Sequence, residues 1–444
     1  MLSRFAPDRQ GRSLLRVLGL FFGIAVSIGC TLGVGILRQP GPVAAYLREP
    51  WLIMLVWSAG AVYSGLGALN VAELATMIPR AGGFYVYARE AMGDTVGFAV
   101  GWSDFLANVA AAAYAVMAAV EFLGRVAPAS EHFSRLIATG FILAFFAIQW
   151  LGIRISGRVQ QAASAAAAAA LIGLVAACFT IAPADHALPV PPAPAASFIA
   201  ALVLAIQSVV VTFDGWYEPI YFAEETRRPA HSIPRAMFGG LALVTSIYLL
   251  LNLAFLRALG PARLAASKFA AADAARLIFG RSSEFLLSGV AVVILLTLLH
   301  VVLMTGTRIL FAVSRDFAAG RGTLFWRRVA MVAPNGTPRT ALAITTIGAI
   351  ALVLSGSVDR LIAMAGFFYV ANYCWSYLSL IVLRFKQPAA ERPFRVPGYP
   401  LPTLLALAAS LAFLTGAVFS DRMNSLYALV LLTASYPAYV LLRR

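Results

Sequence analysis

The chain has 444 residues, of which 61% are hydrophobic and 12% are charged. A water-soluble domain has about 25% charged residues, so the composition excludes a soluble enzyme or binding module and indicates an integral membrane protein. The formal net charge is +15 at pH 7, but the basic residues concentrate in alternate connections between apolar segments. This distribution follows the positive-inside rule. It predicts that both termini are cytoplasmic, and it gives no reason to expect a nucleic-acid partner.

Apolar stretches long enough to cross a bilayer as helices, which takes about 20 residues, recur about twelve times along the chain. They lie at residues 15–37, 51–78, 95–123, 135–153, 160–182, 197–222, 236–258, 284–312, 340–356, 360–383, 401–419 and 424–442. We therefore expect an all-α polytopic membrane protein with about 12 transmembrane helices in the lipid bilayer.

The first apolar stretch contains two glycines one residue apart, Gly33 and Gly35. Each glycine weakens a helix by about 1 kcal/mol relative to alanine. A broken helix persists in a bilayer where its free N–H and C=O groups face protein, water or a ligand, so this break is a candidate transport site. Close helix packing is the alternative, since small residues also line membrane helix interfaces.

Two acidic residues follow in the second and third helices. Glu73 lies near the end of the second helix, where a salt bridge or snorkelling toward water is expected. Asp104 lies in the third helix, and an ionisable group inside a span is a candidate pathway residue. Its position near the predicted cytoplasmic end of that helix argues against this role.

The sixth apolar stretch is interrupted near its middle by Asp214, Gly215 and Pro219. Asp214 either caps a half-helix that begins at Gly215 or Trp216 or contacts a substrate amine, and the sequence leaves both open. Glu218 is a further candidate for the pathway or for proton coupling. The first and sixth helices hold corresponding positions in two five-helix halves, which is the pattern of an inverted repeat.

The eighth helix carries three polar candidates. His300 is either a hydrogen-bonded structural residue or a relay in the pathway. The hydroxyl groups of Thr305 and Thr307 are possible ligands of a sodium ion.

Four motifs between the first break and the loop after the tenth helix point to one family. Residues 33–41 read Gly-Val-Gly-Ile-Leu-Arg-Gln-Pro-Gly, and residues 213–216 read Phe-Asp-Gly-Trp, with Ile-Pro-Arg-Ala at residues 233–236. Residues 305–316 begin with Thr-Gly-Thr-Arg and end with Arg-Asp, and residues 392–397 read Arg-Pro-Phe-Arg-Val-Pro. In these motifs the chain resembles the amino acid–polyamine–organocation transporters, and within them the bacterial relatives of the L-type amino acid exchangers.

The resemblance implies the fold of the sodium-coupled leucine transporter, with five plus five inverted helices and two peripheral ones. The implied divisions are residues 1–182 and 197–383 for the two repeats and 401–444 for the peripheral helices. In such folds, N–H groups at a half-helix start hold the substrate carboxylate, and unwound carbonyl groups hold the amine. The implied substrate contacts are Cys30, Thr31, Gly33, Val34, Gly35, Val211, Phe213, Asp214 and Trp216. The possible coupling or pathway residues are Asp104, Glu218, His300, Thr305 and Thr307.

Three departures from the family pattern bear on the function. Val34 stands where the family usually has serine, which removes one hydroxyl contact to a carboxylate. The fifth helix has apolar Leu171 or Ile172 where proton-coupled relatives carry lysine. The connection from Gly124 to Arg135 lacks the cysteine through which the heteromeric animal members join an accessory chain.

These observations predict a secondary transporter of amino acids or related small amines that works by alternating access, with exchange favoured. A proton- or sodium-coupled symporter of amines or polyamines is the alternative, and a non-transporting membrane receptor is the alternative outside this class. Ser-His-Asp, paired-carboxylate and metal-ligand patterns do not converge within the spans, so an enzyme is not expected. Neither a cofactor, a metal site nor a disulfide-linked accessory subunit is expected. The expected location is the bacterial inner membrane.

Overall fold

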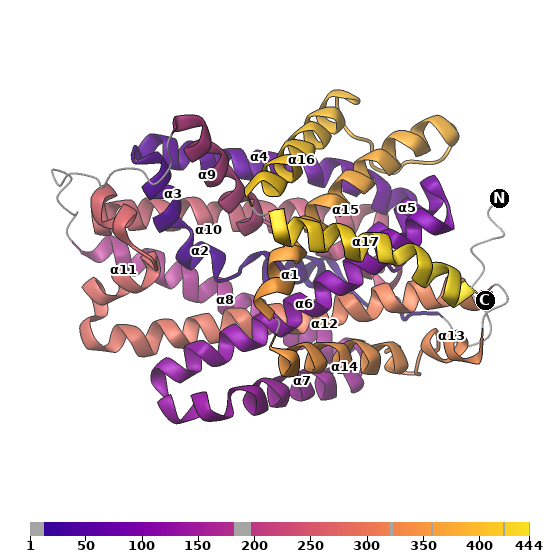
Figure 1. Ribbon diagram of the computed structural model, residues 1–444, viewed down its shortest axis with the longest axis horizontal. Helices are drawn as coiled ribbons and strands as arrows, with labels where there is room; N and C mark the ends of the chain where they lie inside the picture. The colour runs from indigo at the N-terminus through magenta and orange to yellow at the C-terminus, as the bar shows by residue number, and fades with distance from the viewer. Residues whose placement is uncertain (1–12, 182–196, 320–322, 357, 421, 444) are drawn as a thin grey trace.

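The computed structural model describes residues 13–181, 197–319, 323–356, 358–420 and 422–443. In chain order its elements are α1 (Leu20–Thr31), α2 (Gly35–Arg38), α3 (Pro40–Leu47), α4 (Pro50–Met77), α5 (Phe84–Met92), α6 (Asp94–Val126), η2 (Pro128–Phe133), α7 (Ser134–Trp150), α8 (Ile153–Thr180), α9 (Phe198–Thr212), η3 (Glu218–Glu225), α10 (Pro229–Ala266), α11 (Ala270–Phe279), η4 (Gly280–Ser282), α12 (Ser283–Ala319), α13 (Leu324–Val329), α14 (Arg339–Ser355), α15 (Val358–Lys386), α16 (Leu401–Ser420) and α17 (Arg422–Arg443). Most of the long helices run along the longest axis of the molecule (Figure 1). The end that carries α5 and α13 is called the α5 end here, and the end that carries α3 and α11 is called the α11 end (Figure 1).

The described helices fit a membrane protein. Eight segments are long and apolar enough to cross a bilayer, namely α4, α6, α8, α10, the α11–α12 segment, α15, α16 and α17. Four shorter apolar helices, α1, α7, α9 and α14, coincide with the remaining expected spans. The all-α polytopic fold is therefore confirmed. The count of twelve crossings and the inverted repeat stay predictions.

Both expected helix breaks are present. α1 ends at Thr31, and the chain turns before a new helical segment begins at Gly35. Likewise α9 ends at Thr212, and the 3-10 helix η3 begins at Glu218. The breaks were predictable because glycine and proline interrupt otherwise apolar stretches.

The helix begins later than the first apolar stretch, because α1 starts only at Leu20. The N–H of Leu18 donates to the carbonyl of Glu225 at 3.0 Å, and the N–H of Arg227 donates to the carbonyl of Leu18 at 3.0 Å. These bonds form the isolated bridge between Leu18 and Thr226. The backbone before α1 therefore pairs with the chain after η3 instead of with its own first turn.

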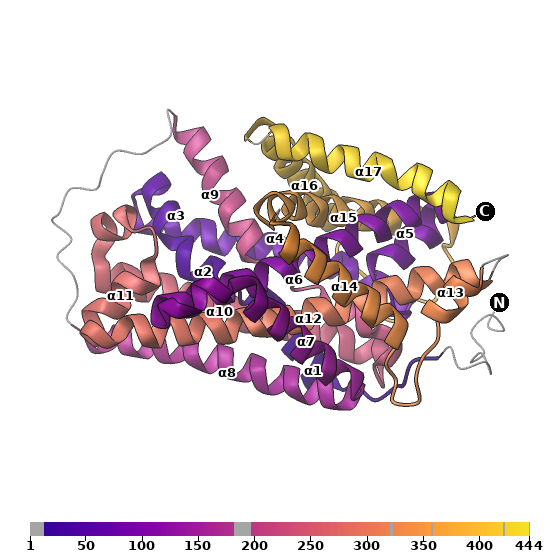
Figure 2. The ribbon, with the colours of Figure 1, turned by 60° about the horizontal axis from the view of Figure 1, so that its bottom comes forward.

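Helices α1, α6 and α12 lie inside the bundle, whereas α16 and α17 lie outside it. α1 packs against α8, α10 and α12, and α6 packs against α12 and α15. Figure 2 shows α17 on the outer surface beside α16. Only 17% and 22% of the most apolar stretches of α16 and α17 are buried, which agrees with the prediction that the last two helices are peripheral.

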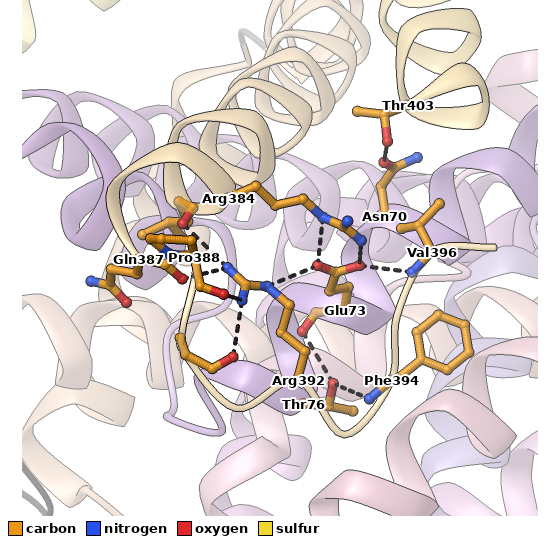
Figure 3. Close-up of polar contacts among 12 residues, drawn as sticks. Asn70, Glu73, Thr76, Arg384, Gln387, Pro388, Arg392, Phe394, Val396 and Thr403 are labelled. Atoms are coloured by element: carbon orange, nitrogen blue, oxygen red, sulfur yellow. Dashed lines mark hydrogen bonds and ion pairs between the residues drawn. The ribbon is translucent and has the colours of Figure 1, made fainter. Parts of the chain in front are cut away.

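The loop after α15 is anchored on α4 through a buried carboxylate (Figure 3). Glu73 accepts hydrogen bonds from the Arg384 guanidinium at 2.9 and 2.5 Å and from the Val396 N–H at 2.7 Å, and it pairs with Arg392 at 3.2 Å. Arg392 also donates to the carbonyl of Leu383, near the end of α15, at 3.2 Å. The predicted salt bridge of Glu73 is thus confirmed, and it joins two helices that are far apart in sequence.

Candidate functional site

The two helix breaks lie directly against each other at Gly215. A Cβ atom built on Gly215 would lie 2.8 Å from the carbonyl carbon of Cys30 and 2.8 Å from the nitrogen of Thr31. Gly215 also has a φ of 110°, a conformation that glycine adopts at low steric cost. Glycine at this position therefore allows the backbone of the second break to contact the backbone of the first.

Tyr248 of α10 links the ends of the two half-helices. Its buried hydroxyl lies 2.6 Å from the carbonyl oxygen of Thr31 and 3.1 Å from that of Thr212. Thr31 is the last residue of α1 and Thr212 is the last residue of α9. The last carbonyl groups of a helix lack intrahelical donors, so a single hydroxyl group serves both helix ends.

The segment after the first break begins with unpaired donors. Within the described ranges, the N–H groups of Val34, Gly35 and Ile36 donate no hydrogen bond. Gln39, between α2 and α3, has helical dihedral angles, so these N–H groups start one helical run that continues to Leu47. Unpaired N–H groups at a helix start favour an anion.

Unpaired acceptors lie at the neighbouring ends of the half-helices. The carbonyl oxygens of Cys30 and Phe213 accept no hydrogen bond from any described residue. The carbonyl of Thr31 already accepts bonds from two donors, and that of Val211 accepts one at 3.3 Å. Of these four carbonyl groups, those of Cys30 and Phe213 are therefore the two that remain available to a ligand.

Asp214 does not cap the second half-helix. The N-cap residue of η3 is Tyr217, and no side chain caps that helix start. The Asp214 carboxylate instead accepts a hydrogen bond from the hydroxyl of Tyr217 at 3.2 Å and one from the hydroxyl of Tyr373 in α15. The capping alternative is wrong because the turn after α9 is longer than expected, and it separates Asp214 from the helix start at Glu218.

Two further buried carboxylates surround the second break. Glu218 accepts a hydrogen bond from Thr305 of α12 at 2.5 Å and one from the thiol of Cys30 at 3.4 Å. Asp104 of α6 accepts a hydrogen bond from the hydroxyl of Tyr221 at 2.8 Å. Among the described residues, neither these carboxylates nor that of Asp214 forms an ion pair with lysine or arginine. The chain around the breaks therefore carries three acidic groups without a lysine or arginine partner among the described residues.

Aromatic residues enclose the acidic groups. The ring of Trp216 packs on Tyr217 and Tyr373, with centroids 5.3 and 5.5 Å apart, and the ring of Phe84 lies 4.9 Å from that of Tyr217. Phe213 packs on Tyr248 at 5.0 Å. Trp216 and Phe213 thus pack the second break against α15 and α10, respectively.

Two of the predicted pathway residues do not join this group. The ring of His300 stacks on Phe145 of α7 at 5.0 Å, and neither ring nitrogen has a hydrogen-bond partner in the described part of the chain. The hydroxyl of Thr307 donates to the carbonyl of Leu303 in its own helix at 2.7 Å. Only Thr305 of these α12 candidates contacts the acidic groups.

Sequence reasoning missed the tyrosines of the site. Tyr248 and Tyr373 lie in α10 and α15, where an isolated tyrosine in an apolar helix gives no signal of its partner. Tyr217 and Tyr221 were within reach, since they lie four residues apart directly after the predicted break, and residues at this spacing share a helix face.

Ion pairs hold the elements together at the α5 end. Glu225 of η3 pairs with Arg308 of α12 at 3.1 Å, and both side chains are buried. Glu224 pairs with Arg315 at 2.8 Å. Asp316 pairs with Arg89 of α5 at 2.6 Å. These ion pairs join η3 to α12 and α12 to α5, between the helix breaks and the α5 end.

Comparison with known proteins gives one family and a consistent set of relatives. The sequence profile described as amino acid permease matches residues 13–436. The chain is 25% identical over 433 residues to the serine/threonine exchanger SteT of Bacillus subtilis (strain 168), with 97% of each chain covered. It is 26% identical over 450 residues to the b(0,+)-type amino acid transporter 1 of Mus musculus, covering 99% of this chain and 90% of the relative. It is 27% identical over 399 residues to the Asc-type amino acid transporter 1 of Mus musculus, covering 86% and 73% respectively.

Proposed function

The chain belongs to the amino acid permease family and is an amino acid transporter, and we propose that it exchanges amino acids or related small amines by alternating access. The observation that carries this proposal is the pairing of opposite polarities at the breaks, with unpaired N–H groups on one side and unpaired carbonyl and carboxylate groups on the other. No chemical bond changes in such a process, and transport follows from exchange between conformations that bind the solute differently.

The polarity of the site fits a zwitterion in one orientation. The N–H groups of Val34, Gly35 and Ile36 would hold the carboxylate, because the positive end of the helix dipole adds to their charge. The carbonyl groups of Cys30 and Phe213 would hold the ammonium group. Val34 has no hydroxyl group, so the backbone alone would bind the carboxylate.

Space for the carboxylate is present at Gly33. The nearest atoms to a Cβ built on Gly33 are backbone atoms 3.8 and 3.9 Å away. At Gly35 the side chain of Thr212 lies 3.2 Å from such a Cβ. Open space in front of unpaired N–H groups supports substrate binding over close helix packing as the role of Gly33.

Three acidic groups without basic partners favour a substrate rich in amine groups. Asp214 lies next to the unpaired carbonyl of Phe213, and Glu218 contacts Cys30 of the first break. A buried carboxylate is stabilised by an opposite charge, and the ammonium group of a substrate would supply it. Cationic or amine-rich amino acids are therefore the proposed preferred substrates.

Proton-coupled symport of amines is the second candidate function, and one observation favours it. Glu218 and Asp104 are buried and have only hydroxyl, thiol and amide donors around them, so either could carry a proton. Exchange remains the first proposal because the fifth helix has apolar residues at Leu171 and Ile172, and because the relative SteT is named an exchanger.

The proposal extends to topology and partners. Residues 1–182 and 197–383 would form the two inverted repeats, and residues 401–444 the peripheral helices. The positive-inside distribution supports cytoplasmic termini in a bacterial inner membrane. The connection from Gly124 to Arg135 has no cysteine, which supports transport without a disulfide-linked accessory subunit.

Reconstituted protein tests the proposal. A thermal-shift screen of the twenty amino acids and common polyamines would identify ligands, and labelled uptake into proteoliposomes would follow. We expect uptake only into vesicles preloaded with substrate, and little change when an inward proton gradient is imposed. Concentrative uptake into empty vesicles under a proton gradient would favour the symporter, and ligand binding without any counterflow would favour a receptor.

A further inference from the structure

A cluster of charged and aromatic side chains lies at the α11 end and belongs to neither break. It consists of Arg38 at the end of α2, Glu121, Phe122 and Arg125 near the end of α6, and Phe269 directly before α11. We call it the arginine cluster. Its location brings together three elements that are distant in sequence, and α2 and α11 are in contact there (Figure 2).

The arginine cluster carries more positive than negative charge. The carboxylate of Glu121 pairs with Arg125 at 2.8 Å and with Arg38 at 3.5 Å. The side chains of Arg38, Arg125 and Glu121 are 39%, 36% and 56% exposed. One carboxylate therefore serves two guanidinium groups, and both guanidinium groups reach solvent.

The aromatic rings fix the guanidinium groups in place. The Arg38 guanidinium lies 5.5 Å from the centroid of Phe122 and 5.6 Å from that of Phe269. The Arg125 guanidinium lies 4.7 and 5.9 Å from the same two centroids. Cation–π contacts of this kind hold a guanidinium at a ring, and its planar set of N–H donors matches the two oxygens of a carboxylate.

The arginine cluster is adjacent to the proposed carboxylate site. Arg38 is the last residue of α2, whose first residue is Gly35. Three residues of helix correspond to about 4.5 Å of rise, so one short helical segment separates the unpaired N–H groups from the cluster. Arg38 therefore connects the arginine cluster directly to the helical segment that begins with these N–H groups.

We propose that Arg38 and Arg125 form an entry subsite that binds the carboxylate of an amino acid before it reaches the helix breaks. This inference rests on the proposed function, since it assumes an amino acid substrate. The subsite binds transiently, because its groups are exposed to water and screened by salt. It raises the local concentration of substrate near the α2 helix start.

Charge variants of Arg125 test the subsite. The substitutions are Arg125→Lys, Arg125→Gln and Arg125→Glu, and Arg276→Gln is the matched control, since Arg276 is an exposed arginine in α11 at the same end. The variants are reconstituted in phosphatidylcholine vesicles, which lack anionic headgroups. The assay measures KM and kcat for homo-exchange of the amino acid that the wild-type protein exchanges fastest, at low and high salt.

We expect Arg125→Gln to raise KM roughly two- to fivefold at unchanged kcat, the size of an exposed charge contact. Arg125→Lys and Arg276→Gln should stay near the wild-type KM, Arg125→Glu should raise it further, and high salt should reduce these differences. Equal KM values in all four variants would overturn the subsite, as would a loss of kcat at constant KM, which indicates a gate. If the wild-type protein itself exchanges no amino acid, the proposed function fails first, and the two failures are distinguishable.

Discussion

The substitution Gly33→Ala distinguishes two roles of the first helix break, one in folding and one in substrate binding. The structure leaves room for a methyl group at this position, since beyond the adjacent residues no atom lies closer than 3.8 Å to the added Cβ. Gly33 also lies outside the left-handed region of φ, so alanine fits the backbone. A Gly→Ala change at such a position stabilises a protein by about 0.4–1 kcal/mol through the unfolded state. Gly33→Ala is therefore expected to fold at least as well as the wild-type protein.

The same methyl group should impair transport. It would occupy the space in front of the unpaired N–H groups of Val34 and Gly35, where we place the carboxylate. A hydrogen bond to a charged group contributes about 1.5–3 kcal/mol, so the loss of one such bond raises KM at least about tenfold. Gly33→Val adds more bulk in the same space, and we expect it to abolish exchange.

Labelled exchange in proteoliposomes gives KM, and the thermal midpoint in detergent reports stability. Gly140→Ala is the matched control, because a Cβ there has no neighbour within 4 Å, and Gly140 lies in α7, outside both breaks. A wild-type KM for Gly33→Ala would refute the reasoning. A fall in its thermal midpoint would instead assign Gly33 to helix packing.

Three further substitutions test other contacts. Asp214→Asn should lower substrate affinity more than a hundredfold, because breaking a buried charge pair costs about 3–5 kcal/mol; wild-type affinity in a competition assay would remove Asp214 from the site. Tyr248→Phe leaves the carbonyl of Thr212 without its donor, whereas the carbonyl of Thr31 keeps the N–H of Gly33, so the change should destabilise the fold by about 1–3 kcal/mol, measured as a lower thermal midpoint. An unchanged midpoint would mean that another donor replaces the hydroxyl. Glu73→Gln should destabilise by about 3 kcal/mol, whereas Glu121→Gln, at an exposed pair, should change stability by less than about 1 kcal/mol. Equal effects of these two would contradict the role of burial.

The sequence allowed the two breaks to be located because their signals are local. Glycine at Gly33, Gly35 and Gly215 weakens a helix wherever the rest of the chain lies. The residues that hold the breaks together give no such signal. Tyr248 bonds to Thr31 and Thr212, which lie 217 and 36 positions away in the sequence. From the sequence alone, this tyrosine cannot be distinguished from one that faces lipid headgroups.

The acidic residues show the same limit. The position of Asp104 near a predicted helix end argued against a pathway role, and no local signal indicated that it is buried against Tyr221, 117 residues away. Asp214 had two local interpretations, and the choice between them depended on how many residues the turn after α9 contains. Gly215 in that turn contacts the first break, and such a tertiary contact leaves no local signal in the sequence.

The bridge at Leu18 limits the number of parts that can move independently. Its two backbone hydrogen bonds join the chain before α1 to the chain after η3, while Tyr248 joins the other ends of α1 and α9. A conformational change that displaced α1 alone would have to break both hydrogen bonds of the bridge at Leu18. Displacement of α1 together with η3 keeps both bonds intact. We therefore expect any opening toward the α5 end to move α1 and η3 together, and to break the ion pairs of Glu224 and Glu225.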